Sequence, residues 1–486
     1  DPDVIRVEDT YYMVSTTMHF MPGCEILQSF DLVHWEHVTY VYETLDHTDA
    51  QQLKSGQNIY GQGMWAASLR YHEGRFWICF VANDTRKTYL YTSEKIDGPW
   101  KKQLIEGFYH DGSLLFDEDG RSYIVYGNDE IWITELNEDL TAPKKDGLHR
   151  LLVSDHKNPE LGYEGSHIQK INGYYYIFLV HSLRDRWMRT EACFYSDSLE
   201  GEFTGGDVLC DDRGYCGQGV AQGGIVDTPD GKWYAMLFQD SGAVGRIPIL
   251  LPVTWKDHFP FFGQNGHVPE EIEVHSTRPG YIYQPLVGSD DFCNGLLPRW
   301  QFNHDPDPRY YHLDALQGTY TITTREVCTE LTQAVNTLTQ RMSYPSCAAE
   351  VTVDASALKE GDVAGLCALQ GCYAAVGITK HHGKYEVLML DKKEDGILDM
   401  TEGTVVESHQ MDFRLEADFC NMKDEARCYY RVNKGDWLPI GTVHKLYFKL
   451  DHFTGCRFGL FCYAAEETGG SACFRDFKYY DVDEIS

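Results

Sequence analysis

The sequence has few basic residues, with 42 lysines and arginines against 74 aspartates and glutamates over 486 residues. The net charge of -32 repels polyphosphates and anionic lipid surfaces, so we expect neither nucleic acid nor a membrane surface as partner. No run of 18 or more apolar residues occurs, and no transmembrane helix is predicted. Walker, dinucleotide-binding and HExxH motifs are also missing. A neutral ligand fits this charge balance best.

The sequence contains cysteines, but their spacing matches neither a zinc site nor a disulfide scaffold. The 15 cysteines are scattered from Cys24 to Cys473, without CxxC pairs or the dense spacing of a disulfide scaffold. We interpret them as reduced and mainly buried, which favours a cytoplasmic protein and leaves a secreted protein with a few disulfides as the alternative. The first residue is Asp1 rather than methionine, so we expect the natural chain to extend upstream, where a signal peptide would lie.

Helical periodicity is almost absent, whereas short strand patterns repeat. Five segments share one pattern, a short β run, a turn built mostly on Asp-Gly, Glu-Gly or Asn-Gly, and a second run rich in aromatic residues. Their spacing of roughly 45–65 residues includes that of propeller blades. The sequence therefore predicts a five-bladed β-propeller over residues 1–266, with an irregular β-sandwich as the alternative. The segments are 1–17, 67–83, 111–128, 165–182 and 223–240.

The pattern changes after the fifth repeat. Residues 267–288 contain three prolines and no sustained alternation, which predicts a linker lying over the first domain. Alternating runs then predict a two-sheet β-sandwich over 289–486, so the whole chain is expected to be all-β. The expected strands include 319–324, 349–355, 385–390, 446–450 and 458–464.

Three repeats begin with or just after a carboxylate, namely Asp1, Asp111 and Glu164. Each alone is a weak signal, because Asp-Gly is a common turn and a glutamate before glycine is usually solvated. The innermost strands of a propeller run side by side toward one channel, so carboxylates at equivalent positions are expected to converge. This recurrence makes them candidates for acid–base chemistry.

The chain resembles glycoside hydrolase family 43, in its β-xylosidase and α-L-arabinofuranosidase branch. The motifs DPDVIRVEDTYYMVSTT, GMWAASLRYHEGRFWICF, DGSLLFDEDGRSYIVYG, YEGSHIQKINGYYYIF and GQGVAQGGIVDTPDGKWYAMLFQD carry the likeness. The second half resembles the concanavalin-like, jelly-roll sandwich that follows the propeller in those xylosidases. The resemblance implies an inverting mechanism with Asp1 as general base, Asp111 as the pKa-modulating and orienting aspartate, and Glu164 as general acid. No cofactor is required for this chemistry.

The resemblance also implies residues that bind the sugar. Arg246 matches an active-site arginine, and Trp65 and Phe20 match aromatic walls of the sugar subsite, although core packing is an equal alternative for Phe20. Gln222 stands where many members have a histidine bound to calcium or water in the channel, so a channel metal is not expected. Asp3, two residues after Asp1, is a reserve candidate for the base.

A structural calcium is the one metal considered for the sandwich, held by Asp290, Asp291 and Asp476 near the two ends of that domain. His381 and His382 are expected to lie in a surface turn, since neighbouring residues on a strand point to opposite faces.

The predicted function is the exo-acting removal of terminal pentoses, most of all β-D-xylose from xylo-oligosaccharides, with α-L-arabinofuranose from arabinoxylan as a second substrate. The sequence does not choose between these sugars. It also leaves the oligomeric state open, with a homo-oligomer among the expectations. The alternatives are a catalytically silent carbohydrate-binding protein, an endo-arabinanase and a protein-interaction scaffold.

Overall fold

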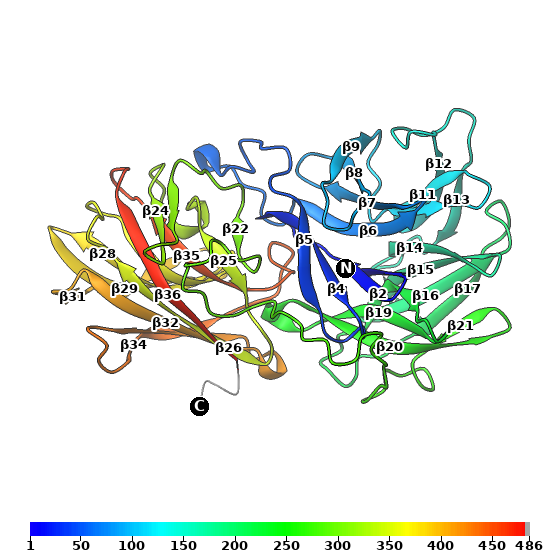
Figure 1. Cartoon of the computed structure of the whole chain (residues 1–486). Helices are drawn as coiled ribbons and strands as arrows, with labels where there is room; N and C mark the ends of the chain where they lie inside the picture. The colour runs from blue at the N-terminus through cyan, green and yellow to red at the C-terminus, as the bar shows by residue number, and fades with distance from the viewer. Residues whose placement is uncertain (482–486) are drawn as a thin grey trace.

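The protein folds into two all-β domains that lie side by side (Figure 1). The computed structural model describes residues 1–481. The first domain consists of five four-stranded antiparallel sheets, each assembled in chain order. This is a five-bladed β-propeller, so the prediction from the five repeats is confirmed.

Each predicted hairpin forms the first two strands of one blade. Blade 1 contains β1 (Asp3–Val7), β2 (Thr10–Val14), β4 (Gly23–Ser29) and β5 (Glu36–Tyr42). Blade 2 contains β6 (Met64–His72), β7 (Arg75–Ala82), β8 (Lys87–Ser93) and β9 (Lys101–Ile105). Blade 3 contains β10 (Ser113–Phe116), β11 (Ser122–Asn128), β12 (Glu130–Leu136) and β13 (His149–Ser154). Blade 4 contains β14 (Glu164–Ile171), β15 (Tyr174–Ser182), β16 (Arg189–Ser196) and β17 (Thr204–Leu209), and blade 5 contains β18 (Ala221–Asp227), β19 (Trp233–Asp240), β20 (Arg246–Lys256) and β21 (Phe259–Phe262).

Apolar side chains fill the space between every pair of neighbouring blades. Five separate clusters of buried residues join blades 1 and 2, 2 and 3, 3 and 4, 4 and 5, and 5 and 1. The first strands of the blades, β1, β6, β10, β14 and β18, contact one another around the centre. Burial of these inter-blade faces is the main force that closes the ring.

Ion pairs between the inner strands complete the closure of the ring. Arg6 of β1 pairs with Asp227 of β18, which links the first blade to the last. Arg70 of β6 donates to Asp3 Oδ2 of β1 at 2.8 Å and to the carbonyl oxygen of Leu114 in β10 at 2.8 Å. One guanidinium therefore ties three inner strands together.

The second domain is a sandwich of a nine-stranded and a seven-stranded antiparallel sheet. The nine-stranded sheet contains β3 (Phe20–Met21), β22 (Gln301–Asn303), β25 (Leu338–Arg341), β35 (Arg457–Tyr463), β27 (Val363–Leu369), β28 (Ala374–His381), β29 (Lys384–Lys392), β30 (Leu398–Met400) and β31 (Thr404–Val406). The seven-stranded sheet contains β23 (Tyr311–Asp314), β24 (Thr319–Thr323), β36 (Ser471–Asp481), β26 (Ser346–Asp354), β32 (Gln410–Asp418), β33 (Glu425–Arg431) and β34 (Leu438–Lys445).

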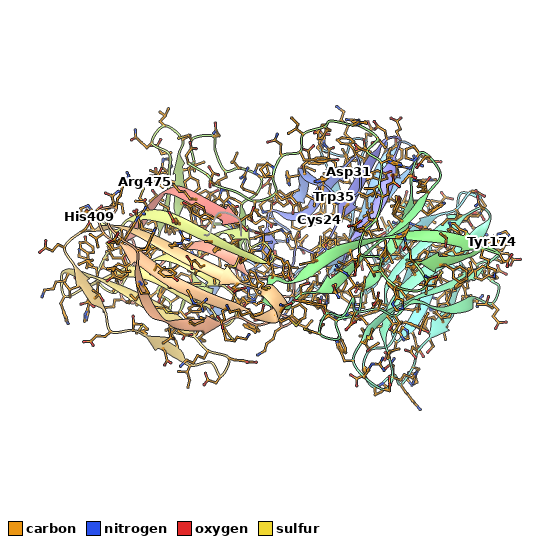
Figure 2. The ribbon with its side chains drawn as sticks, turned by 90° about the horizontal axis from the view of Figure 1, so that it is seen from below. Cys24, Asp31, Trp35, Tyr174, His409 and Arg475 are labelled. Atoms are coloured by element: carbon orange, nitrogen blue, oxygen red, sulfur yellow. The ribbon has the colours of Figure 1, made fainter. Side chains whose placement is uncertain are left out.

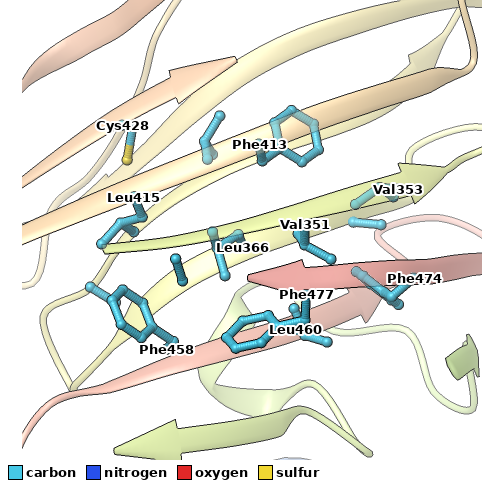
Figure 3. Close-up of a cluster of buried hydrophobic side chains, with 14 of the residues drawn as sticks. Val351, Val353, Leu366, Phe413, Leu415, Cys428, Phe458, Leu460, Phe474 and Phe477 are labelled. Atoms are coloured by element: carbon cyan, nitrogen blue, oxygen red, sulfur yellow. The ribbon is translucent and has the colours of Figure 1, made fainter. Parts of the chain in front are cut away.

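The core of the sandwich is formed by the facing sides of its two sheets (Figure 3). Val351 of β26 and Phe413 of β32 belong to one sheet, and Leu366 of β27 and Leu460 of β35 belong to the other. All four side chains are buried. Alternating apolar residues in these strands, which the sequence shows, are what a sandwich core requires.

Two departures from the sequence prediction involve the boundary between the domains. β3 lies in a loop of blade 1 but pairs with β22, so a propeller segment completes a sandwich sheet. Residues 446–450, predicted as a strand, form an irregular loop in which only Leu446 is well buried. The loop is fixed by long-range bonds, since the amide of Tyr447 donates to Oε1 of Gln370 at 3.1 Å and the amide of Leu446 donates to the carbonyl oxygen of Asp424 at 2.8 Å.

The segment between the domains lies against blade 1. The amide of Thr277 donates to the carbonyl oxygen of Phe30 at 2.7 Å, and the hydroxyl of Tyr283 accepts from the amide of Phe30 at 2.9 Å.

Figure 2 places Tyr174 at the outer edge of the propeller and His409 at the far end of the sandwich. Within residues 1–481 the helical segments are four short 3-10 turns, at Lys54–Gly56, Gly242–Val244, Leu331–Gln333 and Cys420–Met422. No helix in this described part has the length and apolarity needed to cross a membrane.

Candidate active site

The site lies where the first strands of the blades begin. Three of these strands have a register shift at their start, between Trp65 and Ser68 in β6, Glu164 and His167 in β14, and Ala221 and Gly224 in β18. A β-bulge changes the direction in which nearby side chains point, and bulges are over-represented next to active sites. The repeated bulge thus lies at Trp65, Glu164 and Gln222, three of the predicted site residues.

Each of these three strand starts also contains a residue with left-handed backbone geometry, and so does the segment just before β10. The φ angles are 41° at Ala66, 47° at Asp111, 66° at Gly165 and 61° at Gln222. Non-glycine residues in this region store backbone strain, and such strain clusters at functional sites. Glycine is required at position 165 for a second reason, because a Cβ there would lie 2.6 Å from Cγ of Gln222.

Asp1 is held by two neighbours from different blades. Its Oδ1 accepts from Nη1 of Arg246 in β20 at 2.5 Å, and its Oδ2 accepts from the hydroxyl of Thr16 at 2.5 Å. The Thr16 oxygen in turn accepts from the amide of Ala66 at 2.9 Å. These bonds fix both oxygens of a carboxylate that is only 9% exposed.

A second carboxylate supports the arginine. Asp240 at the end of β19 accepts from Nε of Arg246 at 3.2 Å and pairs with Arg189 of β16. The guanidinium of Arg246 also lies 4.3 Å from the ring centroids of both Phe238 and Phe453. Charge pairing and the two aromatic faces leave this arginine one orientation, with its Nη1 directed at Asp1.

Asp111 and Glu164 form a second group, together with His110. The Nε2 atom of His110 lies 3.6 Å from Asp111 Oδ2 and 3.5 Å from Glu164 Oε2. Asp111 Oδ2 accepts from the amide of Gly165 at 3.0 Å, and Glu164 Oε2 accepts from Nδ2 of Asn128 at 3.0 Å. These contacts place two carboxyl groups beside one imidazole.

The electrostatics differ between the members of this group. Burial raises the pKa of Asp111; His110 opposes the shift and the charge of Glu164 adds to it. The charge of Asp111, followed by Glu164, raises the pKa of His110 to about 9 even though burial acts in the opposite direction. Burial thus favours the proton on Asp111, whereas the charges of the two carboxylates favour a proton on His110.

Two aromatic residues from different domains form one wall of the site. Trp65 of β6 meets Phe453 of the sandwich edge to face, with ring centroids 5.2 Å apart. Asp1, Arg246 and Phe453 also line a cavity of about 500 Å³ between the propeller and the sandwich. The sandwich is therefore part of the site and not a separate appendage.

Gln222 lies in the channel beneath the two aspartates. Together with Asp1, Asp111 and His167 it lines a cavity of about 10 Å³. Its backbone amide donates to Oε2 of the buried Glu191 at 2.7 Å. Burial raises the pKa of Glu191 well above the usual range of a carboxyl group.

The structure thus brings together the predicted residues Asp1, Asp111, Glu164, Arg246, Trp65 and Gln222. The prediction that Phe20 forms a wall of the sugar subsite is wrong. Phe20 is fully buried in the nine-stranded sheet, and the Arg457 guanidinium covers its ring at 3.7 Å from the centroid. Asp3, the reserve base, instead pairs with Arg70 at 2.8 Å and with His167 at 3.2 Å.

The three aspartates suggested for calcium do not form a ligand set. Asp290 accepts from the indole nitrogen of Trp300 at 2.8 Å and from the amide of Phe292 at 2.7 Å, whereas Asp476 is exposed. Within residues 1–481, the one group of three such side chains whose donor atoms all lie within 4.8 Å of one another is His110, Asp111 and Glu164. The geometry therefore places the only gathered set of metal-ligand types in the described chain at the carboxylate pair, away from the sandwich aspartates.

Sequence reasoning missed His110, Asn128, Asp240 and Phe453. His110 directly precedes Asp111, and Asp240 ends the fifth repeat, so proximity to a repeat was an available signal for both. Phe453 had no such signal, because it comes from a loop of the other domain.

Comparison with known proteins identifies the family. Residues 1–260 match the model described as glycosyl hydrolases family 43, and residues 289–480 match the β-xylosidase C-terminal concanavalin A-like domain. The chain belongs to glycosyl hydrolases family 43. This family-43 chain is therefore a glycosidase, and its sandwich is the concanavalin-like domain that the sequence predicts.

Named relatives cover most of this family-43 chain. A β-xylosidase from Formosa agariphila is 26% identical and covers 99% of this chain and 87% of its own length. A non-reducing end α-L-arabinofuranosidase from Bacteroides ovatus is 25% identical, covering 65% of this chain and 62% of its own. Among solved structures, a bifunctional GH43-CE protein from Bacteroides eggerthii is 41% identical, with a TM-score of 0.91 over all of this chain. The chain spans 62% of the length of that protein.

Proposed function

We propose that the protein is an inverting exo-glycosidase that releases terminal pentoses, most of all β-D-xylose from xylo-oligosaccharides. The observation that carries the proposal is the division of the site into two carboxylate environments. Asp1 is bonded to Arg246 and Thr16, whereas Asp111 and Glu164 lie together beside His110. An inverting glycosidase needs one ionised carboxylate as base and one protonated carboxyl as acid.

Asp1 is suited to the role of base. Its bond to Arg246 favours the ionised form, and an ionised carboxylate accepts a proton from water as the water oxygen attacks the anomeric carbon. Glu164 gives its proton to the leaving oxygen as the glycosidic bond breaks, so one proton is taken up and one is released. Asp111 accepts from the amide of Gly165 and so orients the start of the strand that contains Glu164.

The shape of the site supports exo action. Phe453 packs against Trp65 and, with Asp1 and Arg246, lines a cavity bounded by both domains. A closed wall suits the end of a glycan chain better than a chain that passes through. The names of the relatives include both β-xylosidase and α-L-arabinofuranosidase, so α-L-arabinofuranose is the second substrate of the proposal.

The test uses the chain with xylobiose, xylotriose, an aryl β-D-xyloside, an aryl α-L-arabinofuranoside and linear arabinan. We expect release of single pentoses from the chain end, and proton NMR during the first turnovers should show α-xylose from a β-xyloside. Glu164→Gln should slow xylobiose cleavage by about 10²–10⁴-fold and should slow cleavage of an aryl glycoside with a good leaving group less.

Other outcomes would favour the alternatives. Oligomeric products from arabinan would indicate an endo-arabinanase, and β-xylose as first product would exclude inversion. A folded chain that binds xylo-oligosaccharides but cleaves no substrate would indicate a silent carbohydrate-binding protein.

A further inference from the structure

The proposed mechanism gives His110 no role, yet its imidazole lies beside two of the three proposed carboxyl groups, Asp111 and Glu164. It immediately precedes Asp111 in the chain, and its Nε2 atom is 3.5 Å from Glu164 Oε2 and 3.6 Å from Asp111 Oδ2. This nitrogen is shielded from solvent and has no hydrogen-bond partner within the described chain, so its contacts with the two carboxylates are charge contacts. The imidazole therefore has one set of neighbours, the carboxyl pair.

The charges around His110 favour its protonated form. Asp111 raises its pKa to about 9, burial acts against the shift, and Glu164 adds to it. The one cation that opposes it is Arg86, from the turn between β7 and β8, whose guanidinium lies over the ring of Phe108 at 3.7 Å from the centroid. The charge of Asp111, which contributes most to this shift, therefore favours an imidazolium beside Glu164.

We propose that His110 is a positioning residue for the proton donor: its imidazolium orients Glu164 and stabilises the carboxylate that Glu164 becomes when its proton passes to the leaving oxygen. This inference rests on the proposed function. Before the transfer Glu164 is neutral and gains little from a nearby cation. As negative charge develops on Oε2, the attraction to Nε2 grows, so the interaction is stronger in the transition state than in the ground state.

The position of Asn128 supports the proposed roles of Glu164 as proton donor and His110 as the cation that stabilises its carboxylate. Its Nδ2 donates to the same Glu164 oxygen at 3.0 Å, so Oε2 has a neutral donor on one side and a cation on the other. Both donors would stabilise the carboxylate product of proton transfer. With Oε2 held in this way, Oε1 is the oxygen left to carry the proton toward the leaving group.

The effect must depend on the leaving group. A poor leaving group, such as the second xylose of xylobiose, needs nearly complete proton transfer in the transition state, whereas an activated aryl group needs little. Loss of a cation that stabilises the developing carboxylate should therefore slow xylobiose cleavage more than aryl xyloside cleavage.

The test compares wild type with His110→Gln, which keeps a donor of similar reach but removes the charge. His156→Gln is the matched control, because His156 is exposed and its side chain forms no hydrogen bond within the described chain. We expect kcat for xylobiose to fall by about tenfold or more in His110→Gln and kcat for the activated aryl xyloside to fall by less than about threefold. The alkaline limb of kcat should move to higher pH, since the cation that favours the ionised acid is gone. Equal losses on both substrates with an unmoved alkaline limb would overturn the proposal.

A spectroscopic measurement separates this inference from the proposed function. Histidine-selective nitrogen labelling should reveal one imidazole that stays protonated well above pH 7 and is absent in His110→Gln. In Glu164→Gln the same signal should titrate at lower pH, because one of its two carboxylates is neutral. An inactive wild type that shows these signals would refute the glycosidase proposal alone. An active wild type without them would refute the role of His110 alone.

Discussion

Trp65 of the propeller and Phe453 of the sandwich meet edge to face, with planes at 90° and ring centroids 5.2 Å apart. Phe453 also contacts Arg246, whose guanidinium lies 4.3 Å from the centroid of the phenylalanine ring. Because Arg246 also bonds to Asp1, a side chain of the accessory domain packs directly against the partner of the proposed base.

Phe453→Ala should therefore reduce the activity of the folded enzyme through the pocket, in addition to the loss of stability that follows from removing a buried ring. Loss of the ring removes one wall and one face of the Arg246 packing, so we expect kcat/KM for xylobiose to fall about tenfold or more. Leu450→Ala, an exposed leucine of the same loop, is the control and should match wild type. Equal kinetics of the Phe453 variant and the control would show that the sandwich does not shape the pocket.

Replacement of Arg246 should lower kcat, and replacement by an uncharged residue should lower it more than replacement by lysine. Arg246→Met leaves both Asp1 and Asp240 without this cation, so we expect kcat to fall by about 10²-fold or more, with a smaller fall in Arg246→Lys. Arg278→Met breaks an exposed pair with Asp9 and should leave kcat unchanged. Steady-state kinetics on xylobiose decide between these results, and an active methionine variant would contradict the role of Arg246.

Arg70 and Asp3 should matter for stability and not for the chemical step. Arg70→Met leaves the buried Asp3 without its arginine partner, and breaking such a pair typically costs about 3–5 kcal/mol in the free energy of unfolding. Urea unfolding measures this loss. The kcat of the folded variant at low temperature should remain near that of wild type, and a selective loss of kcat would assign the pair to the site instead.

The same pair predicts an acid dependence. Burial alone would raise the pKa of Asp3, but Arg70 and His167 lower it to about 2. Because the folded pKa is below the unfolded one, the stabilisation is present above about pH 4 and is lost as pH falls toward 2. The stability difference between wild type and Asp3→Asn should therefore shrink over this range. A constant difference would show that Asp3 is not ionised in the fold.

Glu191 predicts the opposite trend. Burial raises its pKa well above the usual range, so folding keeps it protonated while the unfolded chain ionises above about pH 4. Wild type should lose stability relative to Glu191→Gln as pH rises from about 5 to 8. The side-chain amide of this variant keeps an oxygen that can accept from the backbone amide of Gln222, so that bond is preserved. Parallel unfolding curves at the two pH values would contradict this account.

The propeller was predictable because each blade begins with a local signal, a tight turn followed by an aromatic strand. The carboxylates Asp111 and Glu164 were predictable from their positions in those repeats. Residues 446–450 were not, since their apolar alternation resembles a strand but tertiary contacts hold them as a loop. Phe20 shows the same limit, because an aromatic residue in a family motif has the same sequence signal whether it lines a pocket or fills a core.

The two-residue strand β3 determines where the two domains can be separated by truncation or domain exchange. It belongs to the first blade by chain position and to the sandwich by its bonds, as the partner of β22. A truncation at the linker would remove the partner of β3 and expose the fully buried Phe20 and Met21 to solvent. Exchange of the sandwich for one from another enzyme would succeed only if residues 15–22 were exchanged with it. An engineered variant should therefore keep the two domains together as a pair.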